Sequence, residues 1–398
     1  MKAPLAEIIA RALHDAGVKV ATYVPGHGAT QVFSAYCRIS GRAHPVSFHE
    51  EIAYTIAHGS SLVGARAVSL MKAHGFSKAG NSVLDSLYAG TTAGFVTIIF
   101  DDKAGTHSDS ILNLGAYLDG CGIPHRSGTG ERIYQEVIDC FEQSERYQLP
   151  YALTVDADAL DQLAPYDSTP VPPVRLSYRR DIRQHVLCPF FSAYQRAVLD
   201  AKRGGADWKR IPKPPLPLLP DDVPRDWKTL VDSYSPLFTV FQPFRGELVA
   251  GDTGVSSLFA FPPYQCIDIT TCMGGSIPLA LGACLAGYQA VWAVTGDFAF
   301  IAAGHLALLE AVQRRIPLKV LVIYNGQSAT TGGQLIPGGA LERILAGYTE
   351  YVRWITNPVD TREIEQVFRE ATNANEMQII VADYRAVYLK KNGKGLDG

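Results

Sequence analysis

The sequence lacks the short motifs that mark the commonest nucleotide and metal enzymes. Its 398 residues contain no G-x-G-x-x-G, no P-loop and no H-E-x-x-H, which argues against a nucleotide dehydrogenase, an NTPase and a zinc peptidase of the usual kinds. The seven cysteines are scattered and include no C-x-x-C pair, so neither a zinc ribbon nor an iron–sulfur cluster with a usual motif is expected. We expect most of them to be small buried residues in a reducing cytosol.

A strong net charge is also missing. The formal charge of −3 at pH 7 gives no reason to expect a nucleic-acid partner. Residues 1–17 have an amphipathic helical pattern rather than the apolar core of a signal peptide. Residues 269–296 carry no charge, but the proline and glycines among them argue against a membrane span and favour a buried cofactor floor. We therefore expect a cytoplasmic protein with no membrane partner.

Helical and strand patterns alternate along the first part of the chain. In order they are a helix at 4–16, a strand at 18–24, a helix at 30–36, a strand near 45–47, a helix at 50–64, and strands at 67–71, 95–100 and 151–155. This alternation predicts one α/β domain with a parallel sheet over residues 1–165. Dense prolines predict a linker over 166–232, with one helix near 191–202. A second α/β domain is expected over 233–398.

The most informative stretch lies in this second domain, between Val291 and Gly333. An apolar strand ends at Thr295-Gly296-Asp297, a helical pattern covers about 303–314, and a second strand, 318–324, ends at Asn325-Gly326. A strand–helix–strand unit forms a right-handed crossover, which puts both strand ends at one edge of a parallel sheet. Asp297 and Asn325, about 28 positions apart, are therefore expected to be neighbours.

This pair of side chains suits a small hard cation. A carboxylate and an amide oxygen, with backbone carbonyls and waters, match the preferences of Mg2+, and Gly296 lets backbone N–H groups approach a diphosphate. The alternative is an ordinary aspartate at a strand end beside an Asn-Gly turn. The arrangement resembles the motif of thiamine diphosphate enzymes, commonly GDG, a spacer of similar length and NN, although Phe298 and Tyr324 depart from it. That resemblance implies thiamine diphosphate and Mg2+, with the backbone carbonyl of Gln327 as a third metal ligand.

Glu50 is the candidate catalytic carboxylate of the first domain. It opens a helical pattern, where an acidic side chain is stabilised by the helix dipole with no further role. Thiamine diphosphate enzymes carry a glutamate that acts on the cofactor's pyrimidine ring, often as N-E-x-x-A with a later glycine, and Glu50, Ala53 and Gly59 keep that spacing. His49 replaces the usual asparagine. Glu51 is expected to face solvent.

A wider resemblance is to the alpha subunit of indolepyruvate:ferredoxin oxidoreductase. It covers roughly residues 1–160 and 240–340, and its segments are 60–67, 71–75, 101–108, 251–254, 261–263 and 272–277. It implies a pyrimidine-binding domain followed by a diphosphate-binding domain. It also implies a set of cofactor-binding residues, which are Gly251, Asp252, Thr253, Met273, Gly274, Gly296, Asp297, Phe298, Asn325 and Gln327. Met273 is expected to prop the cofactor in its bent shape, the alternative being simple core packing.

His27, His74 and His107 are expected on loops that follow strand ends of the first domain. A lone loop histidine is usually a surface residue. Three on the edge where the cofactor is expected favour roles in proton transfer or in binding a substrate carboxylate.

The resemblance also has limits that bear on the reaction. A cysteine-rich ferredoxin-like region and a Cys-Pro-x-Cys element are missing, and Ser235-Pro236-Leu237-Phe238 stands in place of the latter. Without cluster ligands, oxidation is disfavoured. We therefore predict a carboligase (acyloin synthase), which decarboxylates an aromatic 2-oxo acid such as indole-3-pyruvate and joins it to a carbonyl or acyl acceptor, free or carrier-bound. A non-oxidative decarboxylase is the alternative, and an oxidoreductase subunit is less favoured. The resemblance implies a homodimer or a dimer of dimers.

Overall fold

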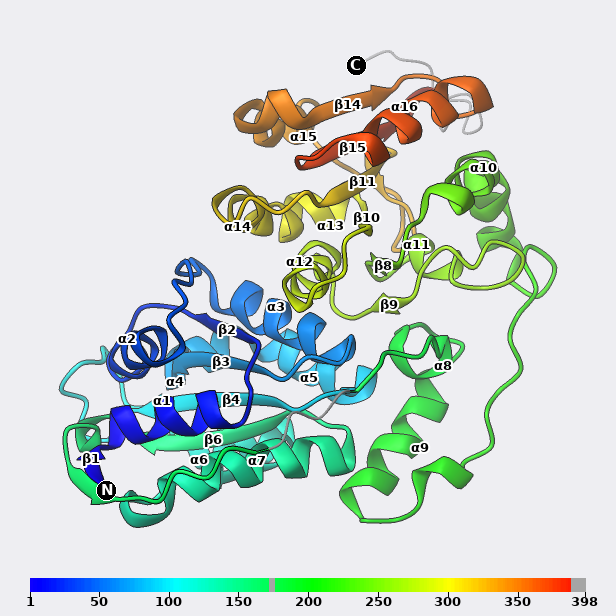
Figure 1. Ribbon diagram of the computed structural model, residues 1–398. Coiled ribbons are helices and arrows are strands. Elements are labelled where there is room, and N and C mark those ends of the chain that lie inside the picture. The colour runs from blue at the N-terminus through cyan, green and yellow to red at the C-terminus, as the bar shows by residue number, and fades with distance from the viewer. Residues whose placement is uncertain (172–175, 388–398) are drawn as a thin grey trace. The chain divides into compact units, whose positions relative to one another are not determined.

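The computed structural model describes residues 1–171 and 176–387. The chain divides into two compact units, each built on one parallel sheet (Figure 1). The first unit comprises Met1–Arg179 and Gln195–Ile211, and the second comprises Arg180–Tyr194 and Pro212–Gly398. The parallel-sheet α/β class expected from the sequence is confirmed.

The first unit has a five-stranded parallel sheet in the order β2-β3-β4-β6-β5. The strands are β2 (Val20–Tyr23), β3 (Ala67–Lys72), β4 (Phe95–Asp101), β5 (His125–Ser127) and β6 (Tyr151–Asp156). A short antiparallel pair, β1 (Lys2–Pro4) and β7 (Leu163–Pro165), is separate from this sheet.

Helices cover both faces of this sheet. One face carries α1 (Leu5–Asp15), α2 (Ala29–Ser40) and α7 (Ile133–Tyr147); the other carries α3 (Glu50–Leu62), α4 (Ala73–Lys78) and α5 (Gly80–Ala89), and α6 spans Leu114–Cys121. Alternate residues of β4 show the two faces. Val96 joins the core beneath α1, whereas the Phe95 ring packs edge-on against Tyr54 of α3, with centroids 4.8 Å apart. Burial on both faces explains why β4 reads as a continuous apolar run.

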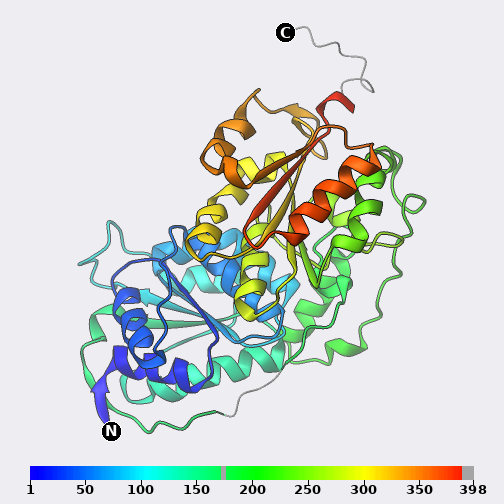
Figure 2. The same cartoon turned by 45° about the horizontal axis from the view of Figure 1, so that its top comes forward.

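The second unit has a six-stranded parallel sheet in the order β14-β15-β11-β10-β8-β9. The strands are β8 (Leu248–Gly251), β9 (Ile269–Thr270), β10 (Val291–Gly296), β11 (Lys319–Tyr324), β14 (Val352–Ile355) and β15 (Gln378–Asp383). In Figure 2 the red strand β15 runs alongside α16 (Thr361–Asn373). α16 packs with α10 (Arg225–Phe241) over an aromatic core that includes Trp292 and Phe368, whose ring centroids are 5.6 Å apart.

The opposite face of the second sheet positions the site. It carries α12 (Ser276–Ala286) and then the crossover helices α13 (Asp297–Ala302) and α14 (Leu308–Gln313), with a 3-10 turn, η5 (Gly304–Ala307), between them. Shorter elements complete the unit, namely α8 (Ile182–His185), α11 (Val255–Leu258), α15 (Ala340–Leu345) and the hairpin β12 (Gln327–Ser328) and β13 (Gln334–Leu335).

Three elements differ from the sequence prediction. The strand expected near 45–47 is absent from the described structure, because Pro45 has no N–H and the segment is tied to β2 by Ser47 N–H donating to Tyr23 O at 2.9 Å. β5 was not expected, since its three residues are too short to show a period. The helix predicted over 303–314 instead begins at Asp297 and breaks at Ala303, which has φ −153° and ψ −35°.

The region predicted as a linker is shared by the two units. Helix α9 (Ser192–Arg203) confirms the helix expected near 191–202, and the division between units falls inside it, after Tyr194. α10 starts before the predicted domain boundary at 233. Nowhere in the described ranges does a helix have both the length and the apolar character needed to cross a bilayer.

Helix α9 fastens to the first unit through a buried lysine. Lys202 is 2% exposed, and its Nζ donates a hydrogen bond to Gln148 O at 3.0 Å. Burial lowers the pKa of Lys202 to about 7, because a low-dielectric site disfavours the charged amine. An unfolded chain then binds more protons than the folded one between pH 7 and the usual lysine pKa, so stability rises with pH across that range.

We predict that Lys202→Met stabilises the first unit near pH 7 by up to a few kcal/mol. It should also flatten the rise of stability with pH between about 7 and 10. Gln148 O keeps a bond from Thr91 N at 3.2 Å, so the substitution leaves no orphaned carbonyl. Urea unfolding across this pH range measures both effects. Lys209→Met is the matched control, because the amine of Lys209, like that of Lys202, lies over the Trp208 ring but is exposed. Equal pH slopes in wild type and Lys202→Met would refute the prediction.

Candidate cofactor site

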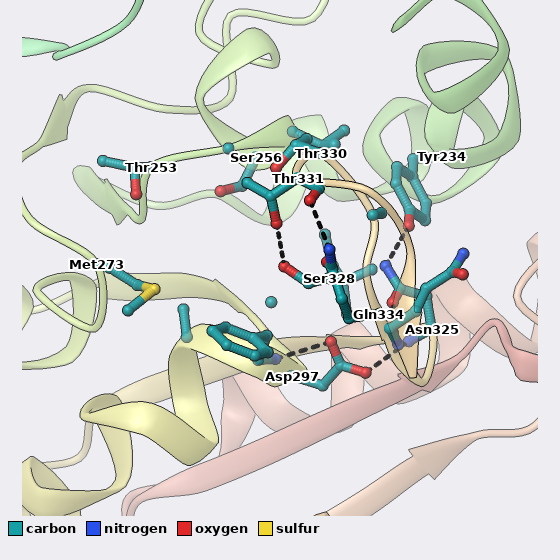
Figure 3. A pocket seen from close by; sticks show the side chains of 18 residues that line it. Tyr234, Thr253, Ser256, Met273, Asp297, Asn325, Ser328, Thr330, Thr331 and Gln334 are labelled. Carbon is teal, nitrogen blue, oxygen red and sulfur yellow. Dashed lines mark hydrogen bonds between the residues drawn. The ribbon is translucent and has the colours of Figure 1, made fainter. Parts of the chain in front are cut away.

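A cavity of about 460 Å³ opens at the carboxyl ends of β8, β10 and β11 in the second unit. Figure 3 shows Asp297 and Asn325 on one side of this cavity and Met273 on another. The remaining wall comes from the turn after β8 and from the segment 328–334. The carboxyl edge of a parallel sheet is where such folds bind ligands.

Asp297 joins the two strand ends, as the crossover argument predicted. Gly296 of β10 lies opposite Ile323 of β11 in parallel register. Asp297 Oδ2 accepts hydrogen bonds from the backbone N–H groups of Asn325 at 3.1 Å and Gly326 at 2.6 Å. Asp297 Oδ1 accepts from Phe298 N at 2.8 Å. The carboxylate is therefore fixed at the turn after β11, although it is on the helix after β10.

The side-chain amide of Asn325 is held on both sides. Its Nδ2 donates to the hydroxyl of Tyr234 at 2.9 Å, and its Oδ1 accepts from Gln327 N at 3.0 Å. Tyr234, on α10, is only 1% exposed and packs edge-on against Tyr384. Sequence reasoning missed Tyr234, since nothing in its neighbourhood marks it as a partner for a residue about 90 positions later.

The donor set of this site suits a hard divalent cation. It consists of the Asp297 carboxylate, the Asn325 amide oxygen and nearby backbone, all oxygen donors of the kind Mg2+ prefers. Burial raises the pKa of Asp297 to about 6 even though three backbone N–H groups oppose the shift. A buried carboxylate that costs this much to ionise is stabilised when a cation lies beside it. Asn325 and Gln327 line the same cavity.

Open space at Gly296 completes a cradle. A Cβ built at Gly296 meets no atom within 4 Å, and this residue lines the cavity, so any side chain there would occupy the space meant for a ligand. Met273 is 43% exposed and Phe298 is 44% exposed, which is unusual for apolar residues beside a core. Thr253 also lines the cavity. These residues fit an extended ligand with a diphosphate group and an apolar ring.

Three of the predicted cofactor-binding residues, Gly251, Asp252 and Gly274, are not among those that line the cavity. Asp252 is fully buried and supports the wall, with Oδ1 accepting from Ser276 N at 2.9 Å and Oδ2 bonded to Thr295 Oγ1. Burial raises its pKa to about 6. Gly251 is within β8, and Gly274 packs against Ala303, where an added Cβ would come within 2.7 Å of the Ala303 Cβ. The break between α13 and η5 thus admits the loop that presents Met273.

A short polar segment was not singled out from the sequence. Ser328, Thr330, Thr331 and Gln334 line the cavity shortly after the Asn325-Gly326 turn (Figure 3). Gln334 Nε2 donates to Thr331 O at 2.9 Å, which closes the segment into a compact loop. The run of small hydroxyl residues and glycines over 328–333 was the available signal, because such residues offer many donors to an anionic group.

Glu50 occupies a second cavity, of about 210 Å³, in the first unit. One of its carboxylate oxygens, Oε2, is enclosed and accepts no hydrogen bond from the described residues, although Lys78 Nζ lies 3.0 Å away as an ion-pair partner. A Cβ on Gly75 would lie 2.7 Å from the Glu50 Cγ, so only glycine leaves room for this placement. An enclosed carboxylate oxygen whose one neighbouring cation is the half-exposed Lys78 fits the role of partner to a protonated ring nitrogen.

The neighbour Glu51 does not face open solvent, contrary to the prediction. Its Oε1 accepts from Ser82 Oγ at 2.9 Å on α5. Burial, with the charge of Glu51, raises the pKa of Asp85 to about 6. Successive residues at a helix start point about 100° apart, which sends Glu50 to the cavity and Glu51 to the α3–α5 contact.

The three predicted histidines lie near one another, but only two of them line the Glu50 cavity. His74 lies in the first turn of α4 rather than on a loop, and its Nε2 is 2.9 Å from Ser110 Oγ. His107 follows β4, and its ring lies against that of His27, with centroids 3.9 Å apart. His74 and His107 line the Glu50 cavity together with Lys72, whereas His27 does not line it.

Comparison with known proteins identifies the domain that contains the larger cavity. Residues 251–381 match the family model of the thiamine pyrophosphate enzyme C-terminal TPP binding domain. The curated relatives include indolepyruvate oxidoreductase subunit IorA of Methanothermobacter marburgensis, 25% identical over 202 residues, or 49% of this chain and 33% of that protein. The subunit of the same name from Pyrococcus abyssi is 29% identical over 174 residues, or 36% of this chain and 27% of that protein. The chain thus spans less than half of the length of either relative.

Two solved structures of decarboxylases share the fold over nearly the whole chain. The 4-hydroxybenzoylformate decarboxylase of Rhodococcus jostii RHA1 aligns with a TM-score of 0.65 at 15% identity, covering 96% of this chain and 99% of that one. Benzoylformate decarboxylase from Polynucleobacter necessarius aligns with a TM-score of 0.65 at 11% identity, covering 96% and 98%. Residues 251–381 are therefore a thiamine pyrophosphate-binding domain, within a chain that has the fold of thiamine pyrophosphate-dependent enzymes.

We predict that Asp297→Ala or Asn325→Ala abolishes Mg2+-dependent retention of thiamine diphosphate. Each removes an oxygen ligand from a cation that needs near-octahedral coordination. Equilibrium dialysis of the cofactor with and without Mg2+ measures retention. Asp383→Asn is the control, since Asp383 ends the neighbouring strand β15 and bonds Arg385 instead of lining the cavity. Either alanine variant binding cofactor and Mg2+ stoichiometrically would disprove the assignment.

We predict that Glu50→Gln keeps the fold and slows exchange of the C2 proton of bound thiamine diphosphate by orders of magnitude. An amide cannot stabilise a protonated ring nitrogen as a carboxylate does. Hydrogen–deuterium exchange at C2, followed by NMR, is the readout. Glu51→Gln should leave the exchange rate nearly unchanged, and the reverse pattern in the two variants would move the role to Glu51.

Proposed function

We propose that the protein is a thiamine diphosphate- and Mg2+-dependent enzyme that decarboxylates an aromatic 2-oxo acid and transfers the remaining carbon fragment to a carbonyl or acyl acceptor. The observation that carries the proposal is the oxygen donor pair of Asp297 and Asn325, which opens into the 460 Å³ cavity of a thiamine pyrophosphate-binding domain. When bound, the cofactor would supply the nucleophilic carbon and the electron sink that decarboxylation of a 2-oxo acid needs.

Residues of the second unit bind and shape the cofactor. Asp297, Asn325 and the Gln327 carbonyl would hold Mg2+, and the hydrogen bond to Tyr234 fixes the orientation of the Asn325 amide. Thr253 and the hydroxyl segment 328–331 face the diphosphate. Met273 would contact the apolar part of the cofactor, since its flexible thioether is exposed to the cavity.

Residues of the first unit handle protons and the substrate carboxylate. Glu50 holds a proton at the pyrimidine nitrogen through its enclosed oxygen. Lys72, His74 and His107 surround the same 210 Å³ cavity and give it positive charge or hydrogen-bond donors. Such groups favour an anionic substrate and can deliver the proton that ends a simple decarboxylation.

The substrates in the names of similar proteins support an aromatic 2-oxo acid as the substrate. The curated relatives carry the name of indolepyruvate, and the solved structures are named for benzoylformate and 4-hydroxybenzoylformate. All three are 2-oxo acids with an aromatic group. Exposed Phe298 and Met273 give the larger cavity apolar surface that suits an aromatic ring. Indole-3-pyruvate is the first candidate and phenylpyruvate the second.

Three reactions share this decarboxylation. Transfer to an acceptor gives an acyloin, protonation gives an aldehyde, and loss of electrons requires a redox partner. The name of the curated relatives favours the redox reaction, whereas the names of the solved structures favour the aldehyde. The missing cysteine motifs favour the two non-redox fates. Carboligation is our choice, with simple decarboxylation as the alternative.

We predict turnover of indole-3-pyruvate without oxygen, ferredoxin, coenzyme A or any added oxidant. One CO2 should be released per donor consumed, and an added aldehyde or 2-oxo acid acceptor should shift the product from aldehyde to acyloin. Mass spectrometry of the products measures the partition. Glu50→Gln supplies the matched inactive enzyme. A strict need for an electron acceptor, or an acyl-coenzyme A product, would contradict the carboligase hypothesis and favour an oxidoreductase.

We also propose a homodimer or a dimer of dimers. The chain exposes several large apolar side chains, among them Phe48 and Leu84 in the first unit and Leu306 and Leu309 in the second. A second copy of the chain would cover such surface and could complete each site. Sedimentation equilibrium should give at least twice the mass of 43.2 kDa. Leu309→Glu should weaken association, and a monomer that retains full activity would rule the assembly out.

A further inference from the structure

A third set of ligand groups lies in the first unit and borders the Glu50 cavity, because one of its members, His107, also lines that cavity. It consists of His27, His107 and Asp158, whose ligand atoms all lie within 4.8 Å of one another. We propose that these three side chains bind one divalent transition-metal ion, of the class of Zn2+ or Co2+. The proposal stands on its own and does not require the proposed function.

The three ligands come from the ends of three parallel strands. His27 follows β2, His107 follows β4 and Asp158 follows β6. His27 Nε2 is 3.1 Å from Asp158 Oδ1, and the two imidazole rings lie side by side with centroids 3.9 Å apart. Ligand atoms around a tetrahedral Zn2+ are about 3.3 Å apart, given metal–nitrogen bonds of about 2.0–2.1 Å. Small side-chain rotations therefore bring this group from its present spacing to that of a coordination shell.

The backbone beneath each ligand is already fixed. The loop that carries His27 lies directly on β4, because a Cβ on Gly28 (φ 86°) would come within 2.6 Å of the Phe100 ring. The amide of His107 donates to Asp102 Oδ2 at 2.8 Å. The amide of Asp158 donates to Asp156 Oδ1 at 3.0 Å. A site whose ligand backbones are held in this way loses little entropy when a metal binds.

The surrounding charge favours a cation. The carboxylates of Asp102 and Asp156 accept hydrogen bonds from the backbone amides of His107 and Asp158, so both lie beside ligand residues. The nearby amine of Lys72 is engaged by the backbone oxygen of His107. These two carboxylates therefore supply negative potential next to the ligand residues.

The choice of metal follows from the donor atoms. Two imidazole nitrogens and one carboxylate suit Zn2+, Co2+ or Ni2+, whereas Mg2+ prefers oxygen alone. The two units would thus carry sites of different selectivity, a nitrogen-rich one here and the all-oxygen pair Asp297 and Asn325 in the second unit. Three protein ligands leave at least one position for water, as in sites that are open to solvent.

A hydrogen-bonded surface pair is the competing explanation, and the chain contains one for comparison. His14 Nδ1 lies 3.2 Å from Asp15 Oδ1 without belonging to a three-ligand group among the described residues. If a histidine–aspartate contact alone were enough to bind metal, His14 would do so as well. His14→Gln is therefore the matched control.

The experiment titrates the full chain, freed of metal by a chelator, with Co2+ and then Zn2+ in the presence of saturating Mg2+. Visible absorption of Co2+ reports the ligand type, and isothermal titration calorimetry with Zn2+ reports stoichiometry and affinity. One equivalent should bind with a nitrogen–oxygen spectrum and no thiolate band. His27→Gln and Asp158→Asn should each weaken binding by at least about 10-fold, and His14→Gln should not.

Three results would overturn the proposal. A thiolate charge-transfer band would assign the ion to cysteine, equal weakening in His14→Gln would indicate adventitious surface binding, and unchanged affinity in both His27→Gln and Asp158→Asn would exclude the site. Asp158→Asn tests the same site through an exposed side chain on a 3-10 turn, so a folding defect in one variant does not leave the question open. Circular dichroism of each variant checks the fold.

Discussion

The structure of the second unit depends on where the carboxylate of Asp297 lies. Its oxygens accept three backbone N–H groups, two of them from the turn that ends the neighbouring strand. Those bonds oppose the cost of burying a charge but do not remove it, since the pKa stays raised to about 6. A bound cation would remove more of that cost. The same carboxylate therefore closes the end of the sheet and is the ligand that we propose for Mg2+, so a substitution of Asp297 would affect both roles.

The sequence predicts those parts of the site that follow from the periodicity of apolar residues and from the direction of parallel strands. The strand ends at Gly296 and Tyr324 could be predicted from apolar runs, and the handedness of crossovers put Asp297 beside Asn325. Glu50 could be placed on the first turn of a helix for similar reasons. Gln327 and Met273 were expected by resemblance, and both line the cavity.

Other features depend on contacts that no local pattern encodes. The Tyr234 hydroxyl meets Asn325 only because α10 packs over the sheet. Glu51 turns to Ser82 rather than solvent because α5 lies against α3. Asp252 sits behind the cavity wall, where its bonds to Ser276 and Thr295 hold the wall in place. In each case the sequence shows the residue itself, but its hydrogen-bond partner is determined by packing between segments that are distant in the sequence.

The connection between the units has a consequence for how the chain reaches this structure during synthesis. The polypeptide passes between the units three times, after Arg179, Tyr194 and Ile211. Lys202 and Arg203 bond to Gln148 and Gly122 of the first unit, so that unit cannot finish folding on the ribosome until residues well beyond its sheet have emerged. By then Arg180–Tyr194 has been synthesised, but the strands of the second unit, to which this segment belongs, have not yet emerged. Assembly of the two units is therefore interleaved in time rather than sequential.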